Sequence, residues 1–201
     1  MNDETPGPAL AMVLLDDVPL GLAALDGLAK EADVDVLQTG TISGGRYLIL
    51  FGGEVGPVER SWRRALDTAG PRVVDEVFLP HAEPRLVPAI GTGAIRWPAP
   101  GDTLGVLQAA TPPALVRAVD AALKGALVDL VELRVGDGLG GKAIASLWGE
   151  THDVEAAIAL ARSSFERANA KGTSTAVIPR ADAAVRETLG APSRFFGEFR
   201  G

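Results

Sequence analysis

Apolar residues recur along both halves of the chain in the same order of spacings. Apolar runs predict strands, and apolar residues at the 3.6-residue period predict helices, in the order strand, helix, strand, strand, helix, strand. The first half places these elements at 9–15, 19–31, 34–41, 46–51, 54–69 and 73–79. The second half places them at 103–109, 112–126, 129–135, 142–148, 150–169 and 174–178. Short helices are expected after each unit, at 83–90 and 180–189.

The order of these elements predicts an α+β fold made of two tandem ferredoxin-like (βαββαβ) domains, each an antiparallel sheet with helices on one face. The residues themselves repeat: DGLAKEADVD at 26–35 is answered by DAALKGALVD at 120–129. The copies are offset by about 94 residues before their Gly-Gly pairs and by about 96 after them, which suits a small domain. We therefore predict domains at 9–95 and 101–190.

Composition narrows the possible partners and chemistry. The net charge of −7 at pH 7 disfavours nucleic acid as a partner. No apolar run approaches the length of a membrane span, and the acidic, turn-rich residues 1–8 do not read as a signal peptide, so we expect a cytoplasmic protein. The chain has no cysteine, which excludes disulfides, thiolate metal sites and cysteine nucleophiles.

The repeated residues resemble the bacterial microcompartment shell family, in its unpermuted tandem form with two shell domains per chain. The family's edge motif, an aspartate followed four residues later by lysine and then by Ala-x-Val, occurs at 26–34 and 120–128. Its glycine-rich turn between strands, closed by Gly-Glu and a Val-Glu helix, occurs in both halves. Its Ile-Pro-Arg after the last strand matches 178–180, whereas the first half departs from it with Leu-Pro-His at 79–81.

This resemblance implies a structural shell protein and not an enzyme. It implies a pseudohexagonal homotrimer that tiles with other hexameric and pentameric shell proteins into the facets of a microcompartment, with a central pore for small polar metabolites. Subunits that exchange surfaces heterologously around a closed axis do form rings. A ligand-binding regulatory module of the same superfold is the alternative.

The resemblance also implies which residues line the pore: Thr41, Ile42, Ser43, Gly44 and Gly45 in the first domain, and Asp137, Gly138 and Leu139 in the second. The Ser43 hydroxyl and the glycine amides would offer hydrogen bonds to a polar or anionic metabolite. An ordinary hairpin turn, with Asp137 capping it, is the alternative. Some relatives carry at the position of Ser43 a cysteine that holds an iron–sulfur cluster; a serine hydroxyl replaces that soft sulfur poorly, so we expect no cofactor.

Lys30, Lys124 and Arg180 are the expected contacts at the tile edges. A lysine can lay its methylene stem along a rim and place its ammonium on neighbouring backbone carbonyls, and the rigid arginine fork suits carbonyl-rich pockets. The alternative for both lysines is a solvated side chain near the end of a helix.

No enzyme or metal constellation is expected. The stretch 136–142 has the glycine and lysine spacing of a phosphate-binding loop, but Ala143 replaces the required Ser or Thr and a strand follows where a helix is needed. His81 and His152 lack partners at metal-ligand or proton-relay spacing.

Overall fold

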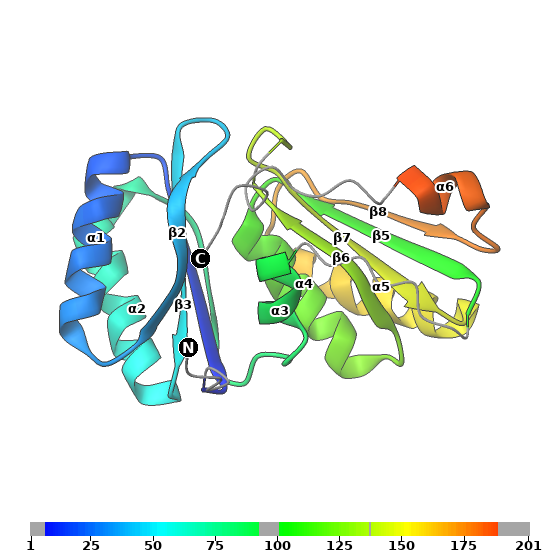
Figure 1. The fold of residues 1–201 in the computed structure, drawn as a ribbon, viewed down its shortest axis with the longest axis horizontal. Coiled ribbons are helices and arrows are strands. Elements are labelled where there is room, and N and C mark those ends of the chain that lie inside the picture. Colours follow the sequence, from blue (N-terminus) through cyan, green and yellow to red (C-terminus); the bar gives the residue numbers. More distant parts are fainter. Residues whose placement is uncertain (1–6, 93–100, 137, 189–201) are drawn as a thin grey trace. The chain divides into compact units, whose positions relative to one another are not determined.

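The computed structural model describes residues 7–92, 101–136 and 138–188. The chain divides into two compact units, Met1–Ala82 and Glu83–Gly201. Each unit contains a four-stranded antiparallel sheet with helices packed on it (Figure 1). The predicted tandem of α+β ferredoxin-like domains is therefore confirmed, while the domain limits of 9–95 and 101–190 stay a prediction.

The first unit follows the predicted order of elements. These are β1 (Ala9–Leu15), α1 (Val18–Glu31), β2 (Asp35–Ile42), β3 (Arg46–Gly53), α2 (Val55–Ala69), a 3-10 turn (Gly70–Arg72) and β4 (Val73–Leu79). The sheet order is β2-β3-β1-β4, so β1 is a central strand, and all of its residues are buried. The Asp17 side chain accepts the Leu20 N–H at 2.9 Å and caps α1, as expected for an aspartate at the start of a helix.

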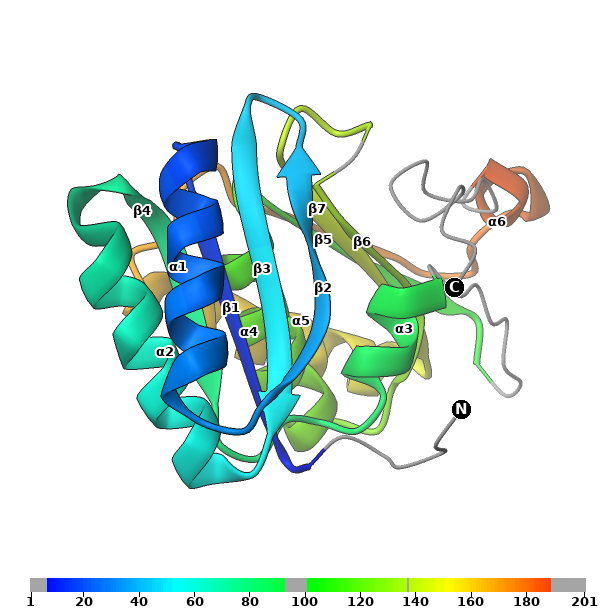
Figure 2. The ribbon, with the colours of Figure 1, turned by 60° about the vertical axis from the view of Figure 1, so that its left-hand side comes forward.

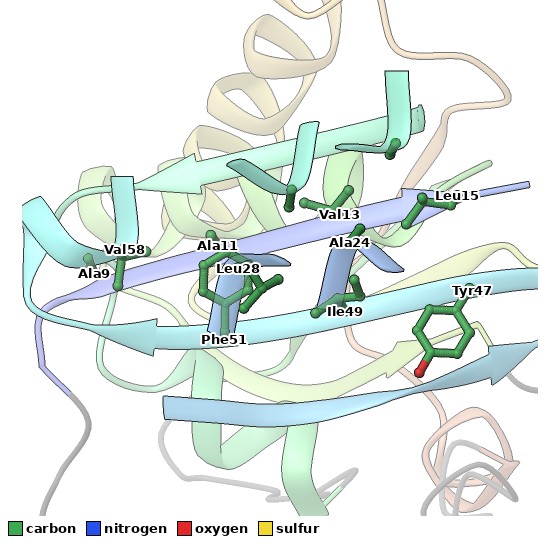
Figure 3. Packing of buried hydrophobic residues seen from close by; sticks show 12 residues of the cluster. Ala9, Ala11, Val13, Leu15, Ala24, Leu28, Tyr47, Ile49, Phe51 and Val58 are labelled. Atoms are coloured by element: carbon green, nitrogen blue, oxygen red, sulfur yellow. The ribbon is translucent and has the colours of Figure 1, made fainter. Parts of the chain in front are cut away.

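The core of the first unit lies between the sheet and its two helices. Alternate residues of β1 meet β3 side chains such as Phe51 and Ile49, together with Leu28 of α1 and Val58 of α2 (Figure 3). The buried Ser61 hydroxyl donates to the Leu28 carbonyl at 2.9 Å, which ties α2 to α1. The period of two along the strands and the helical period on α1 and α2 therefore converge on one apolar layer.

The second unit repeats this arrangement. Its elements are α3 (Leu86–Thr92), β5 (Thr103–Ala109), α4 (Pro112–Gly125), β6 (Asp129–Val135), β7 (Ala143–Gly149), α5 (Thr151–Arg167), β8 (Ser174–Ile178) and α6 (Ala183–Thr188). The sheet order is β6-β7-β5-β8. A Cβ at Gly105 of β5 would come within 2.9 Å of Val154, so α5 approaches the sheet closely there. The helix α3 packs against β6.

The two units are equivalent in backbone detail as well as in order. β2 has a register irregularity between Val36 and Gln38, and β6 has one at the matching place between Leu130 and Glu132. Just after the last strand of each unit, a backbone N–H bonds back to the residue before the first strand. These bonds join Ala82 to the Pro8 carbonyl at 2.8 Å and Ala181 to the Asp102 carbonyl at 2.9 Å. Because the two bonds are equivalent, the residues that follow β4 can be matched one by one with those that follow β8.

One buried acid distinguishes the second sheet from the first. Glu132 on β6 is 1% exposed, and it replaces the Gln38 of β2. Its Oε1 accepts from the Arg134 guanidinium, whereas its Oε2 has no hydrogen-bond partner. Burial raises the pKa of the Glu132 carboxyl above its usual range, although Arg134 acts in the opposite direction.

We expect Glu132→Gln to change how stability depends on pH. Because the pKa of Glu132 is raised on folding, its protonation favours the folded state, so the contribution of Glu132 to stability falls as pH rises from the unfolded pKa through the folded pKa. The glutamine variant lacks that fall, so its free energy of unfolding should improve relative to the wild type as pH increases. Urea titrations between pH 4 and about pH 7 measure this difference.

Glu83→Gln provides the control of opposite sign. The hydrogen bond from Arg85 lowers the pKa of Glu83, so this carboxylate stabilises the fold above its unfolded pKa and loses that effect as pH falls through the folded pKa. Glu83→Gln should therefore cost more stability at neutral pH than in acid. If the stability of the two variants depended on pH in the same way, the conclusion that burial raises the pKa of Glu132 would be wrong.

Candidate functional site

The β2–β3 turn brings the predicted first-domain residues together at one end of the sheet (Figure 2). Thr41 and Ile42 end β2, with the Thr41 residue exposed and Ile42 buried. Ser43, Gly44 and Gly45 form the turn that leads to β3. Gly44 and Gly45 have φ values of 87° and 70°, and a Cβ at either would meet nothing within 4 Å. Glycine is therefore required by the backbone conformation and not by crowding within one chain.

The corresponding β6–β7 turn is longer and closes itself with backbone hydrogen bonds. The Gly136 N–H donates to the Lys142 carbonyl at 3.1 Å, and the Lys142 N–H donates to the Leu139 carbonyl at 3.2 Å. Gly138 is exposed with φ of 69°, and Leu139 is half-buried. Asp137, the expected carboxylate of this turn, lies outside the described residues. The two units therefore present turns of different length at the same place in the fold.

Each predicted edge lysine lies in the last turn of its helix and pairs with the aspartate one turn earlier. The Lys30 ammonium is 2.7 Å from Asp26 Oδ2 on α1, and the Lys124 ammonium is 2.7 Å from Asp120 Oδ2 on α4. The first pair is well exposed, with 74% of the Lys30 side chain and 63% of the Asp26 side chain accessible. Such exposed pairs at this spacing contribute little to stability. The Lys30 ammonium is therefore accessible for other contacts.

The Asp120 edge carries a further set of contacts. Asp120 Oδ1 accepts the Glu83 backbone N–H at 2.8 Å, and only 9% of the Asp120 side chain is exposed. The Arg85 guanidinium donates to the Val128 carbonyl at 2.8 Å and to the Leu123 carbonyl at 3.3 Å. Residues 83–85 are thus seated on the end of α4, where free carbonyls accumulate. Sequence reasoning missed this contact because it joins positions far apart in the chain.

Arg180, the third expected edge residue, is exposed just after β8 and has a φ of 50°, in the left-handed region. Within the second unit, Arg180 follows β8, whereas Lys124 lies in the last turn of α4. His81 follows β4, and His152 lies in α5 with its Nε2 3.4 Å from the Asp153 carboxylate. Among the described residues, no cluster of three or more histidine, aspartate or glutamate side chains could hold a metal ion.

A polar hollow of about 470 Å³ lies in the second unit, between the end of α5 and β8. Its lining includes Arg162, Asn169 and Thr175, and the Arg162 Nε donates to the Thr175 hydroxyl at 2.7 Å. The hollow contains none of the expected pore or edge residues. In the described part of the chain, no helix is both long enough and apolar enough to cross a membrane.

Comparison with known proteins agrees with this duplicated architecture. The family model for the BMC domain matches the chain twice, over residues 9–82 and 103–181. The chain therefore belongs to the BMC domain family, as a tandem-domain shell protein of the bacterial microcompartment type.

Individual relatives extend over most of the chain. The bacterial microcompartment shell protein PduT of Citrobacter freundii is 31% identical over 175 residues, which cover 86% of this chain and 92% of that protein. The crystal structure of a microcompartments protein from Desulfitobacterium hafniense DCB superposes with a TM-score of 0.76 at 28% identity, over 89% of this chain and 98% of that chain. A fused permuted hexameric shell protein from the RMM microcompartment shares the fold, with a TM-score of 0.58 at 20% identity over 80% of this chain and 85% of that chain.

Proposed function

We propose that three copies of this chain form a pseudohexagonal homotrimer that tiles with other hexameric and pentameric shell proteins into the facets of a microcompartment in the cytoplasm. The observation that carries the proposal is the presence of two complete BMC domains in one chain. Two equivalent domains per chain let three chains supply six wedges around one axis, and heterologous contacts that close on themselves form such rings. The likeness to shell proteins supports the tiling.

We further propose that the β2–β3 and β6–β7 turns meet at the axis and line a pore for small polar metabolites. The support is local: the Ser43 hydroxyl and the exposed Gly44 and Gly45 lie at a turn with empty space beside both glycines. The six turns would surround the axis with backbone N–H groups, and the three β2–β3 turns would add the Ser43 hydroxyls, which together bind polar or anionic solutes weakly enough to let them pass.

The first test is the mass of the purified protein and the form of its assemblies. Light scattering should give the mass of three chains, and electron microscopy should show flat hexagonal sheets, because each trimer would meet its neighbours along several edges at once. A monomer or dimer whose melting temperature rises saturably with a small molecule would instead favour the regulatory module.

Ser43→Phe tests the pore. If three copies of Ser43 converge near the axis, three phenylalanine rings should occlude it and reduce the flux of a small polar solute across reconstituted shells severalfold. Ser43→Ala is the matched control, because it removes the hydroxyl without adding bulk and should keep the pore open. The trimer mass should be unchanged in both variants. Undiminished flux in Ser43→Phe shells would place Ser43 away from the permeation path.

A further inference from the structure

Asp26 and Asp120, the aspartates that pair with Lys30 and Lys124, each accept a hydrogen bond from their own lysine, but their second carboxylate oxygens differ. In both units the lysine ammonium donates to Oδ2 of the aspartate, at 2.7 Å. Oδ1 of Asp120 also accepts the Glu83 N–H at 2.8 Å. Within the described residues, Oδ1 of Asp26 accepts no hydrogen bond. Asp26 Oδ1 is therefore a hydrogen-bond acceptor with no donor in the described residues, whereas the equivalent oxygen of Asp120 has one.

The donor is repeated as well. The backbone bonds of Ala82 and Ala181, which anchor equivalent points after the last strands, make Asp182 the counterpart of Glu83. A short helix follows in each case, α3 after Glu83 and α6 after Asp182. In the part of the chain that the structure describes, the Asp182 N–H makes no hydrogen bond, and the residue is exposed. In the described residues, the Asp182 N–H after β8 and the Asp26 Oδ1 on α1 are thus a donor and an acceptor that make no hydrogen bond.

We propose that the segment beginning at Asp182 docks on the α1 edge of a second copy of this chain, with the Asp182 N–H donating to Asp26 Oδ1. The model for this contact is the docking of Glu83 on Asp120 within the second unit. The inference rests on the proposed trimer, because a head-to-tail contact repeated through six domains must join the second domain of each chain to the first domain of the next. The edge aspartate then acts inside the ring, while its lysine stays available at the rim.

The contact between chains differs from its internal counterpart by one side chain. Arg85 places its guanidinium on two carbonyls at the end of α4 and on the Glu83 carboxylate. Ala184 stands at the position equivalent to Arg85, so the contact between chains has no such fork. The hydrogen bond to the charged Asp26 should therefore supply a larger share of the binding free energy of this contact. Its loss should weaken the binding at each contact between chains at least about tenfold.

The absence of cysteine from the natural sequence permits a specific cross-linking test. Ala29→Cys, one turn after Asp26, is combined with Ala183→Cys, next to Asp182; both alanines are exposed. A short thiol-specific bismaleimide should join neighbouring chains and yield a covalent trimer on a denaturing gel. Asp67→Cys on the exposed face of α2, combined with Ala183→Cys, is the matched control and should remain monomeric. Monomers alone from the test pair, an internal link within one chain, or equal cross-linking of the control would each overturn the proposal.

A second measurement keeps the inference separable from the proposed function. Asp26→Ala should shift the trimer toward monomers in sedimentation at low concentration, while Asp67→Ala leaves it unchanged and circular dichroism shows both variants folded. If the wild type is a trimer and Asp26→Ala dissociates no more readily, the docking contact is wrong and the trimer stands. If the wild type is not a trimer, both the proposed function and this contact fail.

Discussion

Replacing both edge lysines with alanine, Lys30→Ala with Lys124→Ala, should leave the trimers intact and abolish their assembly into sheets. The Lys30 ammonium lies at an exposed helix end, and its ion pair with Asp26 contributes little to the stability of the fold. Lys124 pairs with the buried Asp120, which also accepts the Glu83 N–H, so that carboxylate keeps one hydrogen bond in the variant. A sheet, by contrast, repeats every edge contact many times, so a small loss at each edge removes the avidity that holds the array together. Electron microscopy for sheets and light scattering for mass measure the two effects separately.

Arg63→Ala is the matched control for this experiment. Arg63 forms the same kind of exposed pair with the acid four residues earlier, Glu59, but it lies on α2 and outside the edge motif. Sheets should form normally in this variant. If the double lysine variant also forms sheets of undiminished extent, Lys30 and Lys124 are ordinary solvated residues. Single variants then show whether one domain edge contributes more than the other.

Phe51→Ala should destabilise the first unit by about 3–5 kcal/mol, because it removes a large, fully buried side chain. The Phe51 ring belongs to the apolar cluster that also contains Leu28 of α1 and Ala11 of β1 (Figure 3). The surrounding backbone is fixed in a sheet and two helices, so it cannot collapse fully into the space left behind. Urea unfolding at a fixed protein concentration gives the change in free energy.

Leu22→Ala is the control for the core substitution. Leu22 is also a large apolar residue of the first unit, but 54% of it is exposed on α1. Its replacement should change the free energy of unfolding of the isolated chain by no more than about 0.5 kcal/mol. A loss at Leu22 equal to that at Phe51 would mean that the core lies elsewhere than the sheet–helix layer.

Most elements of the fold could be predicted from local patterns, and the misses have local causes. β4 and β5 begin and end at the residues that the sequence predicts, 73–79 and 103–109. β3 was expected to end at Phe51 but extends to Gly53, because Gly53 still pairs with Ala9 of β1 despite a φ of 141°. α5 was expected to reach Asn169 but ends at Arg167, since Asn169 adopts a left-handed φ of 49°, a conformation that terminates helices.

The candidate site was less accessible from sequence, because its contacts depend on tertiary structure. The spacing of four residues places each lysine and its aspartate on one helix face, and in the structure the two form an ion pair, while the role of the lysines at the tile edges stays a prediction. The docking of Glu83 and Arg85 on α4 had no comparable signal, because hydrogen bonds to backbone carbonyls leave no pattern in side-chain identity. The sequence shows only that Leu-Pro-His follows β4 where Ile-Pro-Arg follows β8, so the arginine of the second unit has no counterpart in the first.

The unequal lengths of the β2–β3 and β6–β7 turns have a consequence for how such a pore could evolve. In a ring of identical single-domain subunits, every substitution in a turn is imposed on all six positions at once. In the proposed trimer the short turn and the long turn would be encoded separately, so one set of three could become more polar or bulkier while the other set keeps the aperture. If the turns do meet at one pore as proposed, duplication within one chain lets two parts of the pore lining change independently.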